Sequence, residues 1–326
     1  MENIESYVEP AMRRMATWGA IPAVDEAVFS FFRDVLKYEL RPGNVTTSSL
    51  PLVKSPSQLV IAIVAYLIFV LGGMSMIGAR QRRSKSSNAK GGTEGRANGA
   101  AAPASAAEHA SKSGDGPLLV AMVIVHNAFL VALSMYMCAE GLRAALRGGY
   151  LRRFVRNPMD ASDDAMTRVV YIFYVSKIYE FLDTVIMIVK GNLRQVTFLH
   201  CYHHVSISFI WWAIAFNAPG GEAYLSLIMN SWVHVCMYLY YLLSTVIKEP
   251  GSRKRYLWWG KYLTQMQMLQ FAINLGHGAA CIFLSPYPRF YSILITGYMV
   301  SLLVLFGQFY LSKYKRGGTA AKKKTS

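Results

Sequence analysis

The stretch TFLHCYHHVSISFIWWAIAF, residues 197–216, decides the fold class of this chain. It is apolar and long enough to cross a bilayer, because a spanning helix needs about 20 mostly apolar residues. Its first half carries three histidines, His200, His203 and His204, at helical spacings that place their rings on one face. Titratable side chains are costly within a membrane, so this cluster indicates a functional site rather than simple packing.

The rest of the chain has the composition of a multi-pass membrane protein. Of its 326 residues, 53% are hydrophobic and only 16% are charged, whereas about 25% are charged in soluble domains. We therefore predict an all-α fold in which seven transmembrane helices form one bundle around a chamber. The predicted spans are residues 57–79, 117–142, 167–189, 196–216, 222–246, 257–283 and 289–312.

Four further segments complete the predicted organisation. Residues 1–56 are predicted as a lumenal N-terminal segment that is partly amphipathic helix. Residues 80–116 are rich in Ala, Gly and Ser and predict a disordered cytosolic loop, because they cannot bury enough apolar surface to fold. Residues 117–312 then form a catalytic six-helix bundle, and 313–326 form a basic cytosolic tail.

The distribution of the net charge of +16 predicts the orientation. Lys and Arg gather in the odd-numbered loops and the C-terminal tail, which favours the cytosol for these parts and the lumen for the N-terminus. The second loop departs from this rule, since it holds Arg147, Arg152, Arg153 and Arg156, followed by Asp160, Asp163 and Asp164. Basic residues at membrane boundaries, rather than on one polar domain, argue against a nucleic-acid-binding protein.

Short signals and cysteines add three predictions about compartment. Asn44-Val45-Thr46 is a sequon and predicts lumenal N-glycosylation at Asn44. Lys323 and Lys324 resemble a dilysine signal for retrieval to the endoplasmic reticulum, although a basic tail near anionic lipid explains them equally well. Cys138 and Cys281 fall near predicted lumenal helix ends, where an oxidising compartment would allow them to form a disulfide.

Three other predicted helices carry polar residues on one face. A Lys–carboxylate pair that only locks packing is an alternative reading for Lys177 and Glu180, and interhelical hydrogen bonding is one for the glutamines. The three polar faces consist of Lys177, Glu180, Asp183 and Thr184; of Asn230, His234, Met237 and Tyr241, flanked by Tyr238 and Tyr240; and of Thr264, Gln267, Gln270 and Asn274.

In the predicted topology, these faces converge with the histidines on a chamber that opens to the cytosol. The lumenal half of the bundle stays apolar. Basic residues border the cytosolic mouth: Lys190, Arg194, Arg253, Lys254, Arg255 and Lys261. Such a chamber suits an amphiphile with an anionic head and a long apolar tail.

A metal site is one chemistry that the histidines allow. A single zinc ion could be held by three of them, with Asp183 as a further ligand. A di-iron site is disfavoured, because it needs about eight histidines in several boxes, whereas His126 and His277 are isolated in this sequence. The clustered histidines are only four, namely His200, His203, His204 and His234.

Covalent catalysis is the other chemistry. A neutral imidazole can accept an acyl group, and burial keeps the ring neutral. An acyl-imidazole is labile in water, so a closed apolar chamber is a requirement for it. Cys201 is a competing nucleophile, although it falls at the edge of the histidine face.

Four motifs in order now identify a resemblance to the ELO family of very-long-chain fatty-acid elongases, over roughly residues 115–315. They are KxxExxDT, HxxHH, NxxxHxxMYxYY and TxxQxxQ, which begin at Lys177, His200, Asn230 and Thr264. The resemblance implies a condensing enzyme of the endoplasmic reticulum, a very-long-chain 3-oxoacyl-CoA synthase. It would join a long-chain acyl-CoA to malonyl-CoA and release a 3-oxoacyl-CoA, carbon dioxide and CoA, with no metal or redox cofactor.

The resemblance also implies roles for residues. His203 would accept the acyl group and His234 would handle the malonyl unit, while His200, His204, Glu180 and Asp183 would orient groups and move protons. The remaining positions would bind substrate: Lys177, Thr184, Lys190, Arg194, Asn230, Tyr238, Tyr241, Arg253, Lys254, Lys261, Thr264, Gln267 and Gln270. Gln195 and the pair Asn230-Ser231 are similar to the branch that handles polyunsaturated or very long chains.

The resemblance implies partners as well. Ketoreduction, dehydration and enoyl reduction would fall to separate enzymes, and a homo-oligomer stays open. Two rival readings are a seven-helix receptor or retinal protein, and a proton-coupled transporter or proton channel. Lys313 lies only at the end of the last predicted helix, where a retinal Schiff base would not be buried, and the apolar lumenal half disfavours a conducting path.

Overall fold

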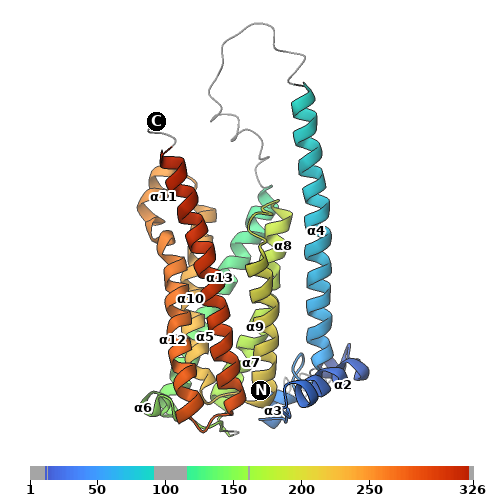
Figure 1. Cartoon of the computed structure of the whole chain (residues 1–326), viewed down its shortest axis with the longest axis vertical. Coiled ribbons are helices and arrows are strands. Elements are labelled where there is room, and N and C mark those ends of the chain that lie inside the picture. The colour runs from blue at the N-terminus through green and yellow to red at the C-terminus, as the bar shows by residue number, and fades with distance from the viewer. Residues whose placement is uncertain (1–11, 13, 92–115, 161, 323–326) are drawn as a thin grey trace, which may run out of the picture.

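A computed structural model describes residue 12 and residues 14–91, 116–160 and 162–322, with side chains left out for 84–91 and 312–322. Within these ranges the chain is helical and contains no strand (Figure 1). The predicted all-α class is therefore confirmed. Helices cover all seven predicted spans, but the number that cross a membrane stays a prediction.

Among the described residues, three helices are long and apolar enough to cross a membrane. They are α4 over Pro56–Arg83, α5 over Pro117–Arg147 and α13 over Arg289–Leu311. These helices support a membrane protein. The predicted span 167–189 is divided at Glu180 into two helices, α7 (Asp164–Tyr179) and α8 (Phe181–Val189). The helices over the predicted spans 196–216, 222–246 and 257–283 contain His, Asn or Gln side chains, which lower their mean hydropathy.

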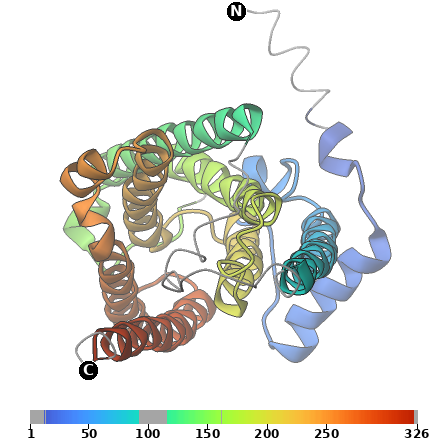
Figure 2. The same cartoon turned by 90° about the horizontal axis from the view of Figure 1, so that it is seen from above.

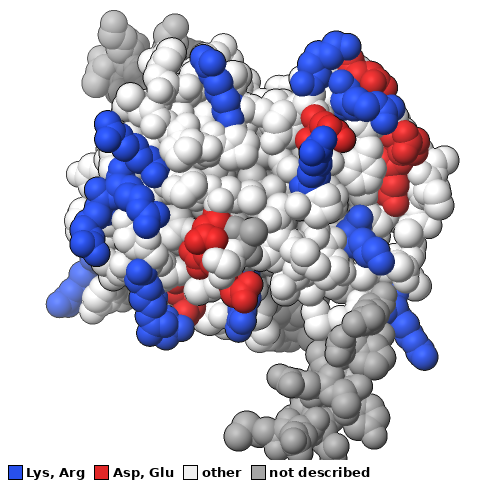
Figure 3. All heavy atoms as spheres, turned by 90° about the horizontal axis from the view of Figure 1, so that it is seen from below, with Lys and Arg blue, Asp and Glu red and all other residues white. Residues whose placement is uncertain are grey.

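The N-terminal part lies beside the foot of α4 (Figure 1). It consists of α2 (Pro22–Ser30), the π-helical turn η1 (Phe31–Val35) and α3 (Val45–Ser48). Asp25 fastens α2 to the start of α4, because its Oδ1 accepts hydrogen bonds from the Ser57 backbone N–H at 2.7 Å and the Ser55 hydroxyl at 2.9 Å. This end of the molecule carries basic and acidic side chains together (Figure 3).

The long helices extend beyond their predicted ends. Helix α4 (Pro56–Gly91) occupies residues 80–91 of the segment predicted to be a disordered loop, while 92–115 lie outside the described residues. Helix α13 (Arg289–Lys322) likewise takes in most of the predicted tail. The predicted retrieval signal at Lys323 and Lys324 lies outside the described residues.

Most of the long helices form a ring when the molecule is viewed along its long axis (Figure 2). Each helix packs against the next in the order α5, α10, α12, α13, α9 and α7, and α7 closes the ring onto α5. Helix α4 packs outside this ring, against α8 and α9. The bounds are α5 (Pro117–Arg147), α6 (Tyr150–Arg153), α7 (Asp164–Tyr179), α8 (Phe181–Val189), α9 (Phe198–Asn217), α10 (Ala223–Val246), α11 (Pro250–Tyr256), η2 (Trp258–Tyr262) and α12 (Leu263–Leu284).

Helix α9 forms much of the core. Trp212 is fully buried, and its indole N–H donates to the carbonyl of Val53 at 3.0 Å. The ring of Trp211 packs against the ring of Phe173 on α7, with the two ring centroids 4.3 Å apart. These contacts fix the rotation of α9 and thereby the direction in which its histidines point.

The structure bears on two predicted modifications and contradicts one of them, the disulfide. The Asn44 side chain is only 5% exposed and accepts a hydrogen bond from the Thr47 backbone N–H at 3.1 Å, capping α3. Glycosylation at Asn44 stays a prediction, and a glycan there would have to displace this cap. Cys138 and Cys281 are both free cysteines, so the predicted disulfide is not formed; Cys281 instead faces His277 one turn earlier on α12.

Candidate active site

A break between α7 and α8 positions the first set of polar residues. Helix α7 ends at Tyr179 and α8 begins at Phe181, with Glu180 between them. The Asp183 backbone N–H bonds the Glu180 carbonyl three residues earlier, at 3.1 Å, which tightens the turn. Glu180 therefore lies at the break between the two helices, and Asp183 lies in the first turn of α8.

Lys177 and Glu180 form a buried ion pair. The Lys177 ammonium donates to Glu180 Oε1 at 2.8 Å, and the two side chains are 1% and 2% exposed. Lys177 also donates to Asn230 Oδ1 on α10 at 3.0 Å and lies 4.2 Å from the centroid of the Phe173 ring. The lysine thus ties two of the predicted motifs together.

His234 joins the same group from α10. Its Nδ1 lies 3.3 Å from Glu180 Oε1, although the angle is not that of a hydrogen bond. The imidazole is buried and packs its ring edge against Tyr238, with centroids 5.5 Å apart.

Asp183 is held by two other side chains. Tyr238 donates its hydroxyl to Asp183 Oδ2 at 2.7 Å, and His126 Nε2 lies 2.7 Å from Oδ1. The His126 ring stacks on Tyr179 at a centroid distance of 5.4 Å. The reading of His126 as isolated is therefore wrong, because α5 brings this histidine across to α8.

Thr184 links the first motif to the histidines of α9. Its hydroxyl lies 2.7 Å from His200 Nε2 and 3.1 Å from the hydroxyl of Tyr66 on α4. Thr184 is fully buried, so this three-membered contact joins α4, α8 and α9 away from water. Tyr66 lies outside the predicted motifs and was missed.

The three histidines of α9 do lie together. The ring centroids of His200 and His204 are 4.4 Å apart, and those of His203 and His204 are 5.7 Å apart. His204 is buried, and its Nδ1 has no hydrogen-bond partner among the described residues. A buried nitrogen without a partner is costly, which makes the ring a candidate for contact with a bound molecule.

His203 has an orienting partner that the motifs do not contain. Its Nδ1 lies 3.0 Å from the hydroxyl of Tyr298 on α13, and that hydroxyl lies 3.1 Å from Ser206 Oγ. Tyr298 is 5% exposed, whereas His203 is half-buried. This contact leaves Nε2 of His203 available for chemistry.

The last predicted motif contributes less to this cluster. Gln267 donates to Met237 Sδ at 3.6 Å, a weak hydrogen bond, while Gln270 is buried and Thr264 half-buried. Tyr241 is 40% exposed and touches the site only through the ring of Tyr238, at a centroid distance of 6.2 Å.

The predicted basic residues lie at the end of the molecule where α8 and α11 are found (Figure 1). Arg194, Lys254 and Lys261 are exposed there, and Lys190 is half-buried. Arg253 has a structural task, because it donates to the carbonyls of Ser244 and Ile247 at 2.9 and 2.8 Å at the end of α10.

The donors suited to a metal ion lie elsewhere. Among the described residues, one group of three His, Cys or carboxylate side chains has its ligand atoms within 4.8 Å of one another, namely Glu222, His277 and Cys281. His200 Nε2, His203 Nδ1 and both oxygens of Asp183 are instead engaged by neighbouring side chains. The arrangement is one of oriented imidazoles and anchored carboxylates, which suits nucleophilic and proton-transfer chemistry.

Known proteins share this sequence pattern. Very long chain fatty acid elongase 5 of Tachysurus fulvidraco is 38% identical over 206 residues, which is 62% of this chain and 68% of that protein. The proteins of the same name from Xenopus tropicalis and Homo sapiens are 37% and 38% identical, and the alignments cover 68% and 67% of their lengths and 62% of this chain. These relatives support a role in fatty-acid elongation.

The family match covers still more of the chain. Residues 51–323 match the family described as ELO: GNS1/SUR4, which includes the helices that carry the polar cluster. The resemblance drawn from the four motifs is therefore confirmed: this chain belongs to the ELO family.

Proposed function

We propose that the chain condenses a long-chain acyl-CoA with malonyl-CoA to give a 3-oxoacyl-CoA, carbon dioxide and CoA, through an acyl group held on His203. The observation that carries this proposal is the contact of His203 Nδ1 with the buried hydroxyl of Tyr298 at 3.0 Å. It orients one imidazole and commits one nitrogen, while the elongase relatives supply the class of substrate.

The first step is acyl transfer to His203. With Nδ1–H donating to the Tyr298 oxygen, Nε2 carries the lone pair and attacks the thioester carbon. The carbon–sulfur bond breaks, Nδ1 gives up its proton, and the departing CoA thiolate takes up one proton. A neutral acyl-imidazole and CoA result.

The second step consumes malonyl-CoA. Its carboxylate leaves as carbon dioxide, and the remaining enolate carbon attacks the acyl carbon, which breaks the bond to His203 Nε2. His234 lies beside Glu180, with 3.3 Å between Nδ1 and Oε1, and its Nε2–H would donate a hydrogen bond to the enolate oxygen. One proton taken up by the released imidazole completes the balance.

The surroundings of the histidines serve this chemistry. Lys177 and Glu180 are 1% and 2% exposed, and His204 is 5% exposed. A site closed to water would protect the acyl-imidazole from hydrolysis. The chamber would accept the acyl chain, while the exposed cations Arg194, Lys254 and Lys261 would attract the phosphates of CoA.

The proposed setting follows from the function. The enzyme would reside in the membrane of the endoplasmic reticulum, with its N-terminus in the lumen and its C-terminus in the cytosol. It would need no metal or redox cofactor for condensation. A ketoreductase, a dehydratase and an enoyl reductase would complete each elongation cycle.

A trapping experiment tests the proposal. Purified protein incubated with a long-chain acyl-CoA alone should release CoA and gain the mass of one acyl group on the peptide that contains His203. The Cys201→Ala variant is the matched control and should keep the adduct, whereas His203→Ala should lose it. An adduct on Cys201, or no burst of CoA before malonyl-CoA is added, would overturn the nucleophile assignment.

A further inference from the structure

A second cluster of reactive side chains lies at the other end of the bundle. Glu222 caps the start of α10, and His277 and Cys281 follow each other by one turn on α12. Glu222 precedes His234 by twelve residues, about 18 Å along the helix axis. The cluster is therefore separate from the histidines of the proposed active site, and none of its members belongs to the four motifs.

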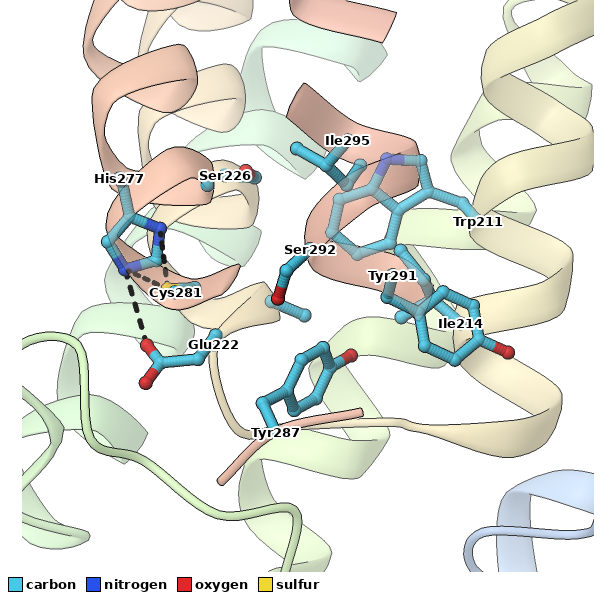
Figure 4. Close-up of a pocket in the computed structure, with 12 residues that line it drawn as sticks. Trp211, Ile214, Glu222, Ser226, His277, Cys281, Tyr287, Tyr291, Ser292 and Ile295 are labelled. Atoms are coloured by element: carbon cyan, nitrogen blue, oxygen red, sulfur yellow. Dashed lines mark hydrogen bonds and ion pairs between the residues drawn. The ribbon is translucent and has the colours of Figure 1, made fainter. Parts of the chain in front are cut away.

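The three side chains point toward one another (Figure 4). His277 Nε2 lies 3.2 Å from Glu222 Oε2 and 3.6 Å from Cys281 Sγ. The exposed fractions are 5% for Glu222, 7% for His277 and 2% for Cys281. His277, like His126, was read as isolated in the sequence, and the structure contradicts that reading.

The Glu222 carboxylate is arranged as an anion. It accepts hydrogen bonds from the Asn157 backbone N–H at 2.6 Å and from Ser285 Oγ at 2.8 Å. Within the described ranges no Lys or Arg pairs with it, and His277 is its one ion-pair partner. A buried carboxylate that stays charged is paired with a cation or coordinates a metal ion.

The separations suit a metal with soft and hard ligands. Zinc bonds of about 2.3 Å to sulfur and about 2.0–2.1 Å to nitrogen and oxygen, at tetrahedral angles, place S and N about 3.6 Å apart and N and O about 3.4 Å apart. Two edges of the cluster, 3.6 and 3.2 Å, are close to these values. Because Cys281 Sγ also lies 3.8 Å from His277 Nδ1, the imidazole has to turn before Nε2 can share a metal with the sulfur. The remaining sulfur–oxygen edge is at most 4.8 Å, and metal binding would have to shorten it.

A cavity beside the cluster leaves room for a further ligand. Its volume is about 30 Å³, and its walls include all three donors together with Ser226 and Ser292 (Figure 4). This is enough space for a water molecule. Three protein ligands with a fourth position open to a small cavity are the usual composition of a reactive zinc site.

We propose that Glu222, His277 and Cys281 form a site for a divalent transition metal, with Zn²⁺ as the best match. This site goes beyond the proposed elongation chemistry, in which it takes no part. Sulfur, imidazole and carboxylate together favour zinc over magnesium or calcium, which prefer oxygen ligands.

Cobalt titration of the purified full chain in detergent tests the site. Co²⁺ should bind at one equivalent and give the visible bands of a tetrahedral ion together with a sulfur-to-metal charge-transfer band. Cys281→Ser should abolish the charge-transfer band, and His277→Ala should weaken binding at least tenfold. Cys138→Ser is the matched cysteine control and should change neither.

A second measurement needs no variant. Excess Zn²⁺ should slow the alkylation of Cys281 at least tenfold and leave the rate at Cys138 unchanged, as read by mass spectrometry of the peptides. A charge-transfer band that persists in Cys281→Ser, or Co²⁺ binding no tighter than in His277→Ala, would overturn the site. Absence of both binding and protection would assign the cluster to a plain Glu–imidazolium pair.

Discussion

Replacing Lys177 by Met should destabilise the protein strongly, because it leaves Glu180 buried without its cation. The Lys177 ammonium and the Glu180 carboxylate are 2.8 Å apart, and their side chains are 1% and 2% exposed. Dissolved salt therefore screens the attraction between these two charges only weakly. Removing one partner of a buried pair costs about 3–5 kcal/mol. That corresponds to a shift of about 10²- to 10⁴-fold in the unfolding equilibrium.

The double variant Lys177→Met, Glu180→Gln should recover most of this stability. Neutral side chains of similar size often replace a buried ion pair at little cost. Stability can be followed in detergent by denaturant unfolding with tryptophan fluorescence, since Trp211 contacts Phe173 on the same helix as Lys177. Lys254→Met is the matched control, because that lysine is exposed, and it should change stability by no more than about 0.5 kcal/mol.

Two results would refute the reasoning. One is Lys177→Met with the stability of wild type, which would mean that Glu180 is neutral or that water reaches the pair. The other is a double variant that is both stable and fully active in condensation. It would show that the pair only locks the packing and that Glu180 does not orient His234.

Three further variants test single contacts. Tyr298→Phe removes the hydroxyl beside His203 and should slow acyl-adduct formation about 2- to 10-fold, which is the rate effect of losing one hydrogen bond. The KM for acyl-CoA should stay unchanged, and an unaltered rate of adduct formation would contradict the orienting role of Tyr298. His234→Ala should leave the adduct on His203 intact but lower condensation about 10²-fold or more, as seen by chasing the trapped adduct with malonyl-CoA, and normal turnover of that adduct would refute it. Tyr66→Phe should cost about 0.5–1.5 kcal/mol of stability through loss of the contact with Thr184, measured by the same unfolding assay, and equal stability would show that the contact contributes nothing.

The sequence predicts the helices and the core of the site well, for a physical reason. Apolar runs of spanning length leave few alternatives to a helix, and helical spacing puts His200 and His204 on one face, where their rings lie 4.4 Å apart. Likewise, Lys177 and Glu180 are three residues apart on neighbouring turns and do form an ion pair. These contacts are local, so periodicity is enough to foresee them.

Contacts between distant helices could not be foreseen in this way. His126 and Tyr298 join the site only because α5 and α13 stand where they do in the ring, and no spacing along the chain encodes that. A signal for His126 did exist, since a histidine within the apolar helix α5 needs a partner. The predicted disulfide failed for the same reason, because similar depth along two helices does not make Cys138 and Cys281 neighbours.

The division of α7 from α8 has an electrostatic consequence. Lys177 lies in the last turn of α7 and Asp183 in the first turn of α8. The backbone dipoles of a helix favour a cation at its C-terminal end and an anion at its N-terminal end. The main chain therefore supplies part of the counter-charge for both residues, and fusing α7 and α8 into one continuous helix would withdraw that support from the two of them at once.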